Sequence, residues 1–211
     1  MKIDLKDPRI KALVVSIKEK CKTHNISFIL EPKKKILLGT ARISGYFDNI
    51  SRELCVAANS PLALEVLIHE SCHLDQWASS CQEWIDLDFE WRTTVIESHY
   101  LFDLWLSGAV DIKQDILDKL VKRIMDNERD CERRSVAKIQ KWKLLDLIDL
   151  DQYCRRANSY ILGYQLVQKN RKWFQKSPYL VDSVWQICAR RIVSGYKMST
   201  IVEKRMQKEC F

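Results

Sequence analysis

The chain has 211 residues, of which 46% are hydrophobic and 30% are charged, a balance that excludes a disordered or fibrous protein. No apolar run reaches the roughly 18 residues that a membrane-spanning helix needs. Charges at Lys2, Asp4 and Lys6 interrupt the stretch where a signal peptide is apolar, so we expect a cytoplasmic protein with no membrane partner. The eight cysteines form no Cys-x-x-Cys pair and predict buried thiols, with a disulfide framework as the alternative.

The net charge of +7 is unevenly distributed along the chain. Residues 1–59 carry +6, residues 60–154 carry −8 and residues 155–211 carry +9. The acidic middle suits a cation site. The basic C-terminal quarter could bind nucleic acid or an acidic partner, but we favour the interpretation that it neutralises the acidic middle.

The first part of the chain predicts a helix followed by about three strands. Pro8 and a three-to-four-residue apolar spacing indicate a helix over residues 8–24. We expect strands over residues 26–30, 36–43 and 52–58, with the second broken by Gly39. Residues 33–35 predict a solvated turn, and residues 44–48 end in a turn. Ser60 and Pro61 are typical of an N-cap and a first helical position, so a helix is expected to start there.

After residue 61 the sequence lacks strand alternation and predicts helices only. We expect them over residues 86–107, 111–145 and 151–175, with a last one around residues 184–193. No linker separates two domains. The predicted fold is therefore a mostly helical α+β protein with a single domain over residues 1–211. Residues 1–80 would form the sheet and the helix after Pro61, and residues 81–211 a helical part.

The helix after Pro61 carries the sequence His69-Glu70-Ser71-Cys72-His73. Four residues are about one helical turn, so both imidazoles lie on one face and can bind one metal ion, usually zinc. Glu70 lies roughly 100° round the helix from His69 and about 60° from His73. It can therefore contact water on the metal without binding the metal, which is the arrangement of a metal hydrolase.

The alternative is that both histidines are core residues of a buried helix. Apolar residues surround the motif on almost every side. A buried helix with His69, Glu70, His73 and Asp75 but no ligand would need four separate polar partners. We therefore favour one Zn²⁺ per chain.

A third ligand is expected from the helix over residues 111–145. Its apolar stripe is interrupted by Glu128 and Glu132, which lie one turn apart. Buried carboxylates need partners, so one of the two could bind zinc while the other orients a ligating histidine. The alternative is that Glu132 pairs with a nearby arginine. Neighbouring charges, including Arg129, are expected to be solvated. Glu97, which precedes His99, is a second possible ligand that we rank behind Glu128.

The order of helix, strands and His-Glu-x-x-His helix resembles the zincin metallopeptidases. Glu128-Arg129-Asp130-Cys131-Glu132 is similar to the gluzincin pattern, in which a ligand Glu is followed four residues later by an acid. Further stretches resemble small uncharacterised zincin-like proteins of phages and bacteria; they are residues 44–48, 69–77, 128–134, 156–160 and 171–173. This resemblance implies a zincin-like fold with Glu128 as ligand and Glu132 behind it. The chain departs from better-known gluzincins by having Glu132 where Asp is usual.

These features predict a zinc metallopeptidase with Glu70 as general base. Its substrate would be a peptide or protein, bound in extended form along a strand near residues 52–58. One rival is a zinc-stabilised binding or regulatory protein without turnover, against which the intact Glu70 argues. A second rival is a nucleic-acid-binding protein that uses the basic C-terminal quarter; no recognisable binding motif supports it.

Overall fold

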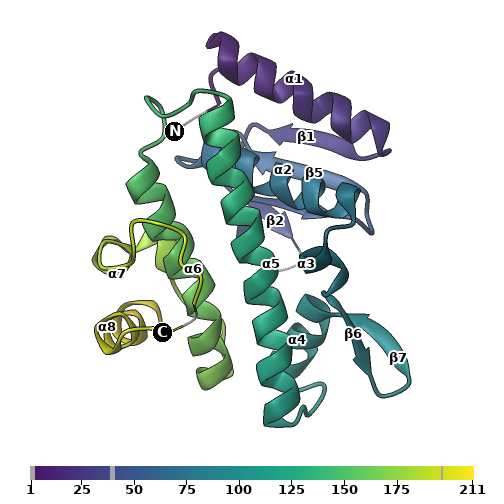
Figure 1. Cartoon of the computed structure of the whole chain (residues 1–211), viewed down its shortest axis with the longest axis vertical. Coiled ribbons are helices and arrows are strands. Elements are labelled where there is room, and N and C mark those ends of the chain that lie inside the picture. The colour runs from purple at the N-terminus through teal and green to yellow at the C-terminus, as the bar shows by residue number, and fades with distance from the viewer. Residues whose placement is uncertain (1–2, 39–40, 196) are drawn as a thin grey trace. The chain divides into compact units, whose positions relative to one another are not determined.

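A computed structural model describes residues 3–38, 41–195 and 197–211, and it is α+β and mostly helical, as predicted (Figure 1). The chain divides into two compact units, the first formed by residues 1–80 and 133–149 and the second by residues 81–132 and 150–211. Residues 133–149 therefore belong to the first unit although they follow residues of the second. Among the described residues, no helix is long and apolar enough to cross a membrane.

The first unit begins with helix α1 (Pro8–Thr23), as predicted. The Asp7 carboxylate caps its N-terminus by accepting hydrogen bonds from the backbone N–H groups of Arg9 and Ile10, and proline occupies the first turn. The five apolar residues of the expected face are all buried: Ile10, Leu13, Val14, Ile17 and Cys21. The predicted spacing therefore identified the packed side of this helix.

The central sheet of this unit has three strands in the order β1 (Ser27–Glu31), β5 (Glu53–Ala57) and β4 (Gly45–Asp48). β5 is parallel to β1 and antiparallel to β4. Residues 45–48 form an edge strand, and a turn follows it as expected, with Asp48 Oδ1 accepting the N–H of Ile50. One expectation is wrong here: the strand over residues 52–58 cannot pair with a peptide, because neighbours occupy both of its edges. Its apolar run is buried because the strand is central.

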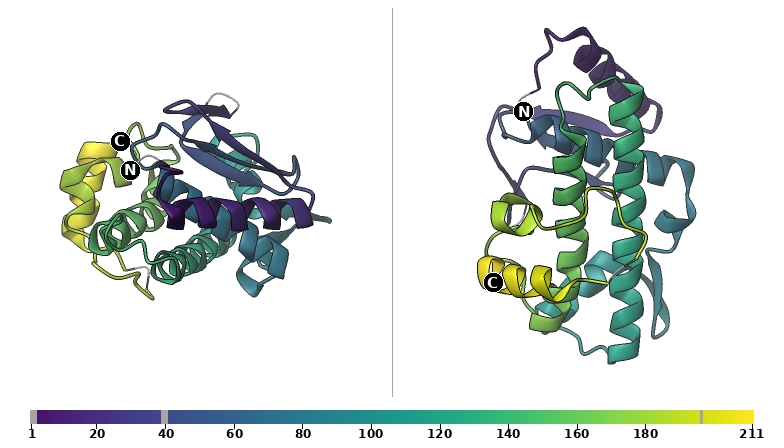
Figure 2. Two further views of the ribbon diagram at one scale, coloured as in Figure 1. Left: turned by 90° about the horizontal axis from the view of Figure 1, so that it is seen from above. Right: turned by 60° about the vertical axis from the view of Figure 1, so that its left-hand side comes forward.

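Each face of the sheet has its own cover. α1 lies against β1, and the motif helix α2 (Ala63–Ser79) lies against β5 and β4 (Figures 1 and 2). A hairpin of β2 (Ile36–Leu38) and β3 (Ala41–Ile43) packs Ile36 and Ile43 against Ile29, Cys55 and Tyr46. The expected strand over residues 36–43 is thus two strands, and the break expected at Gly39 lies outside the described residues.

Helix α2 begins later than predicted. Its N-cap is Leu62, which makes no side-chain capping bond, and its first residue is Ala63. Ser60 Oγ accepts the N–H of Leu62 at 3.3 Å, and the Ser60 carbonyl accepts the N–H of Ala63 at 3.1 Å. The serine and proline therefore form a turn before the helix. The C-terminus is closed by Ser80 in the left-handed conformation, φ 47°.

The second unit contains a hairpin where only a helix was expected. After the short α3 (Gln82–Ile85), β6 (Asp88–Trp91) and β7 (Thr94–Glu97) pair antiparallel, and α4 (Ser98–Leu106) starts only then. The turn places Arg92 at φ 56°. Phe89 is buried between the exposed Asp88 and Glu90, an alternation typical of a half-buried strand. The prediction of a continuous helix over residues 86–107 was wrong for this reason.

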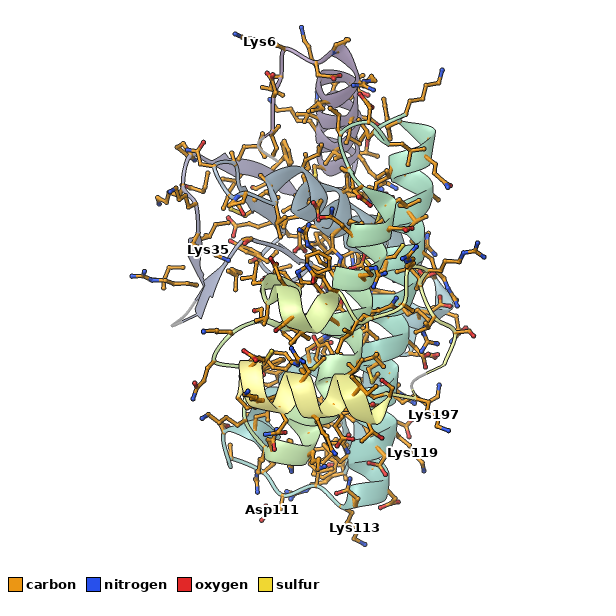
Figure 3. All side chains as sticks on the ribbon, turned by 90° about the vertical axis from the view of Figure 1, so that its left-hand side faces the viewer. Lys6, Lys35, Asp111, Lys113, Lys119 and Lys197 are labelled. Carbon is orange, nitrogen blue, oxygen red and sulfur yellow. The ribbon has the colours of Figure 1, made fainter. Side chains whose placement is uncertain are left out.

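The long helices were predicted correctly, as α5 (Gln114–Lys141) and α6 (Leu150–Asn170). Asp111 and Lys113, just before α5, are exposed (Figure 3). α5 contributes residues up to 132 to the second unit and later residues to the first. The described cysteines are all free thiols, seven of them buried, as expected for a chain without disulfides.

The helix expected around residues 184–193 is mostly absent from the structure, and a helix that was not expected follows at residues 200–210. η1 (Pro178–Leu180) and α7 (Asp182–Trp185) are short. The segment that follows is held by Asn158, whose amide donates to the carbonyls of Ala189 and Arg191 and accepts the N–H of Val193. The last helix, α8 (Thr200–Cys210), was not predicted; it packs Val202, Met206 and Cys210 into an apolar cluster with Leu166, Val184 and Cys188.

Asp75 on α2 is shared by two lysines in an ion-pair network of the first unit. Its carboxylate lies 2.5 Å from Lys20 Nζ of α1 and 2.7 Å from Lys138 Nζ of α5. Lys138 also donates to Ser71 Oγ at 2.8 Å. Burial by itself would raise the pKa of Asp75, but Lys138 and Lys20 outweigh it and the pKa is lowered.

We expect Asp75→Asn to lower the free energy of unfolding by about 1–2 kcal/mol at neutral pH, because the amide leaves both lysines without a carboxylate. A lowered folded-state pKa stabilises the protein fully above the ordinary aspartate pKa of about 3.9, and this stabilisation is lost as the pH falls through the folded value. The difference from wild type should therefore shrink below about pH 4. Urea unfolding at pH 7, 5 and 3 measures it, with exposed Asp115→Asn as control. A difference that does not change with pH would contradict this role of the charge.

Candidate functional site

His69 and His73 project from the same side of α2, and their Nε2 atoms lie 3.2 Å apart. The ring centroids are 4.7 Å apart and the ring planes meet at 88°. Two nitrogens bound to one tetrahedral zinc at about 2.0–2.1 Å would be separated by about 3.3–3.4 Å. The donor types and the separation of the two nitrogens therefore fit a shared zinc ion without any change of backbone.

Gln76 orients one of these histidines. Its side chain is 0% exposed, and its Oε1 lies 2.8 Å from His73 Nδ1. An amide oxygen can only accept, so this contact favours the tautomer of His73 with its hydrogen on Nδ1, in which Nε2 has a lone pair for a metal. Sequence reasoning missed this residue. The available signal was its spacing, because Gln76 is three residues after His73 on the same helix.

Glu70 is buried on α2 beside the edge strand β4. A Cβ atom placed on Gly45 of this strand would lie 2.6 Å from Val66 Cγ1, 3.0 Å from the Cys55 carbonyl oxygen and 3.3 Å from Glu70 Cγ. Any larger residue would therefore push the strand away from the helix. The absence of a side chain at this position lets the backbone of β4 approach the face that carries Glu70.

The fourth polar residue of the motif region, Asp75, has a separate role. Residues 71 and 75 lie about 200° round the helix from residues 69 and 73, so they occupy the opposite face of α2. There Asp75 is paired with Lys20 and Lys138. This residue therefore has the polar partners that a buried helix requires, and it does not need a metal.

Glu97 belongs to the second unit, and both of its carboxylate oxygens accept hydrogen bonds. Oε1 lies 2.7 Å from His99 Nδ1, and Oε2 accepts the N–H of Tyr100 at 2.9 Å as the N-cap of α4. Burial would raise the pKa of Glu97, but His99 and the backbone donors lower it. Its position is thus explained by helix capping, which weakens its candidacy as a metal ligand.

Glu128 and Glu132 are buried on α5, as the interrupted apolar stripe predicted, and they also belong to the second unit. Glu132 accepts a hydrogen bond from the Tyr153 hydroxyl of α6 at 2.5 Å. The pKa of buried Tyr164 is raised well above its ordinary value, by burial first, then by Tyr160 and by the nearby Glu128. Arg129 is 7% exposed, so the expectation that it is a solvated charge was wrong.

A further group of possible ligands in the second unit was not predicted. Donor atoms of Cys81, Glu83 and Asp130 all lie within 4.8 Å of one another, with Cys81 Sγ 4.0 Å from Asp130 Oδ2. All three residues are half-buried at the N-terminal side of α3 and on α5. Partly exposed acidic groups often cluster without a cation, so we assign no function to this group.

We expect Gln76→Leu to reduce the fraction of His73 that carries its hydrogen on Nδ1, because the leucine cannot accept a hydrogen bond. Two-dimensional ¹⁵N–¹H spectra of the imidazole nitrogens report this tautomer directly, without any metal or substrate. Gln82→Leu, at an exposed position of α3, is the matched control. An unchanged tautomer in Gln76→Leu would show that another group orients His73.

The structure thus brings His69, Glu70, His73 and Gln76 together in the first unit, and it places Glu97, Glu128 and Glu132 in the second. Comparison of the chain with protein-family models, with curated proteins and with solved structures finds no match. The resemblance to zincins therefore rests on the motifs themselves.

Proposed function

We propose that this protein is a zinc-dependent peptidase whose site is built on α2. The observation that carries the proposal is the pair of Nε2 atoms of His69 and His73, 3.2 Å apart, with Glu70 between them in sequence on a buried helix. Two imidazoles and a carboxylate are ligands typical of zinc in hydrolases. Gln76 would hold His73 in the tautomer that binding requires, a support that ligating histidines usually have.

Zinc bound by His69, His73 and a carboxylate would polarise the scissile carbonyl and lower the pKa of a water molecule. The protein's own contribution would come from Glu70, which accepts the proton of that water as its oxygen attacks the carbonyl carbon. When the C–N bond breaks, Glu70 returns the proton to the leaving amine.

Glu128 is the proposed third ligand, and Glu132 is the proposed residue that orients a ligating histidine without binding the metal. The order follows from the resemblance to gluzincins, in which the ligand precedes the second acid by four residues. The Tyr153 hydrogen bond on Glu132 is consistent with a carboxylate that is held in place by its surroundings rather than by a metal. Glu97 remains the alternative ligand, ranked lower because its two oxygens already serve His99 and the N-terminus of α4.

The substrate would be an extended peptide that pairs with β4. We choose β4 rather than the strand over residues 52–58 because β4 lies at the edge of the three-stranded sheet. One side of its backbone has no neighbouring strand in that sheet. Its first residue, Gly45, lies against α2, where an added Cβ atom would be 3.3 Å from Glu70 Cγ. A peptide added along this edge would therefore lie close to the general base.

We expect Glu70→Gln to keep zinc and to lose hydrolysis by at least about 10²-fold, because an amide cannot accept the proton of the water. His69→Ala should lose both zinc and hydrolysis. Elemental analysis and a peptide-library cleavage assay measure the two properties, with Glu65→Gln on the same helix as control. Wild-type turnover by Glu70→Gln would exclude Glu70 as the base. A wild-type protein that binds zinc but cleaves nothing would favour a zinc-stabilised binding protein.

The two acids of α5 should respond differently to truncation. Glu128→Ala removes a charged ligand and should leave the protein nearly free of zinc, whereas Glu132→Ala should weaken zinc affinity about 10–100-fold. Zinc titrations with a competing chelator give both affinities, and Glu97→Ala completes the set. The reverse ranking would exchange the roles of the two residues. Loss of zinc in Glu97→Ala alone would move the third ligand to β7.

A further inference from the structure

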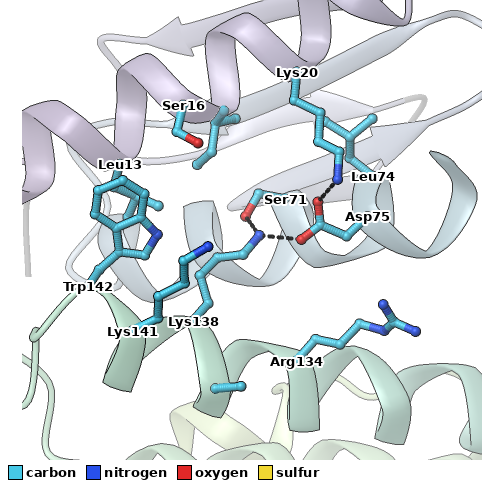
Figure 4. Close-up of a pocket in the computed structure, with 12 residues that line it drawn as sticks. Leu13, Ser16, Lys20, Ser71, Leu74, Asp75, Arg134, Lys138, Lys141 and Trp142 are labelled. Carbon is cyan, nitrogen blue, oxygen red and sulfur yellow. Dashed lines mark hydrogen bonds and ion pairs between the residues drawn. The ribbon is translucent and has the colours of Figure 1, made fainter. Parts of the chain in front are cut away.

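The first unit contains a cleft that the proposed peptidase does not use. It lies between α1, α2 and the C-terminal end of α5, and it has a volume of about 360 Å³ (Figure 4). This volume is at the lower end of the about 300–1,000 Å³ of small-molecule sites. On α2 it is bordered by Ser71, Leu74 and Asp75, the face opposite His69 and His73.

The cleft is strongly cationic. Lys20, Arg134, Lys138 and Lys141 line it, and Asp75 is the only acidic residue among its lining residues. Asp75 is shared between Lys20 and Lys138. The side chain of Lys141 makes no hydrogen bond or ion pair with any residue that the structure describes. The charge of Lys141 is therefore in excess of what Asp75 balances within the cleft.

One of these cations is held in place. The Lys138 side chain is only 15% exposed, and its ammonium donates to Asp75 Oδ2 at 2.7 Å and to Ser71 Oγ at 2.8 Å. Ser71 in turn donates to the Ile68 carbonyl at 2.7 Å, so its oxygen is oriented to accept from Lys138. An ammonium has three N–H donors, and this network uses two of them. A fixed cation with a remaining donor is a better anion ligand than a mobile surface lysine.

The cleft also has an apolar wall. Leu13, Ile17 and Leu74 contribute aliphatic side chains, and Trp142 contributes its indole (Figure 4). The indole N–H of Trp142 has no hydrogen-bond partner among the described residues. In Figure 4 the side chains of Trp142, Lys141 and Lys138 approach the space from the α5 side. A ligand that fits this lining has an anionic end and a flat, apolar end.

We propose that this cleft binds a small phosphate-bearing molecule with an aromatic ring, the phosphate facing Lys138, Lys141 and Arg134 and the ring facing Trp142. Charge-assisted hydrogen bonds from lysine and arginine to phosphate oxygens are among the strongest in proteins. Stacking of a flat ring on an indole adds to them. The site lies on the same helix as the candidate metal site but on its other face, so the two can be tested separately.

The test uses AMP and inorganic pyrophosphate as probes in calorimetric titrations of the full chain at low salt. We expect saturable binding of one molecule per chain, weakened about five- to tenfold by Lys141→Gln and by Arg134→Gln. Lys119→Gln is the matched control, since Lys119 is an exposed lysine of the same helix that does not line the cleft (Figure 3). Trp142→Leu should weaken AMP about fivefold or more and leave pyrophosphate unchanged.

Two outcomes would overturn the site. These are no saturable binding of either probe, or equal affinities in wild type, Lys141→Gln and Arg134→Gln. Equal affinity of AMP for wild type and Trp142→Leu would overturn the ligand class. His69→Ala should bind both probes as the wild type does; loss of binding there would place the anion at the candidate metal site instead. Thermal unfolding of each variant shows that it is folded.

Discussion

The burial of helix α2 is the constraint on which the rest of the first unit depends. Most of its residues are enclosed, yet it carries His69, Glu70, His73, Asp75 and Gln76. A polar group that loses water needs a partner within hydrogen-bonding distance. The helix meets this requirement by placing its polar residues on different faces, each with its own partners. Asp75 faces lysines of α1 and α5, while Gln76 and the two histidines face one another.

This sorting gives α2 two chemically different faces. The histidine face has two Nε2 atoms close together, which suits a metal cation. The opposite face is surrounded by cationic side chains and a tryptophan, which suits an anion. Helical periodicity alone separates the two faces, because residues two positions apart point in nearly opposite directions. The two faces of one buried helix therefore differ in the charge of the group that would suit them.

The second unit stabilises its polar groups differently. The Tyr153 hydroxyl of α6 donates a hydrogen bond to Glu132. Asn158, also on α6, bonds to the backbone of the segment over residues 189–193. Glu97 is the last residue of β7 and also the N-cap of α4. Its carboxylate accepts the N–H of Tyr100 and therefore fixes the start of the helix directly after the hairpin. The side chains of Asn158 and Glu97 bond to backbone groups, which helps to hold the irregular segment over residues 189–193 and the start of α4.

The sequence by itself determined the long elements and the local geometry of the motif. α1, α5 and α6 follow from apolar spacing, and the convergence of His69 and His73 follows from a four-residue step on a helix, because both depend only on near neighbours in the chain. Tertiary structure decided what distant segments contribute. It made residues 45–48 the edge strand, turned residues 88–97 into a hairpin and moved the start of α2 past Pro61. It also set the lysine partners of Asp75 and the tyrosine partner of Glu132. These outcomes depend on pairing and packing between residues far apart in sequence, whose free energies local propensity does not contain.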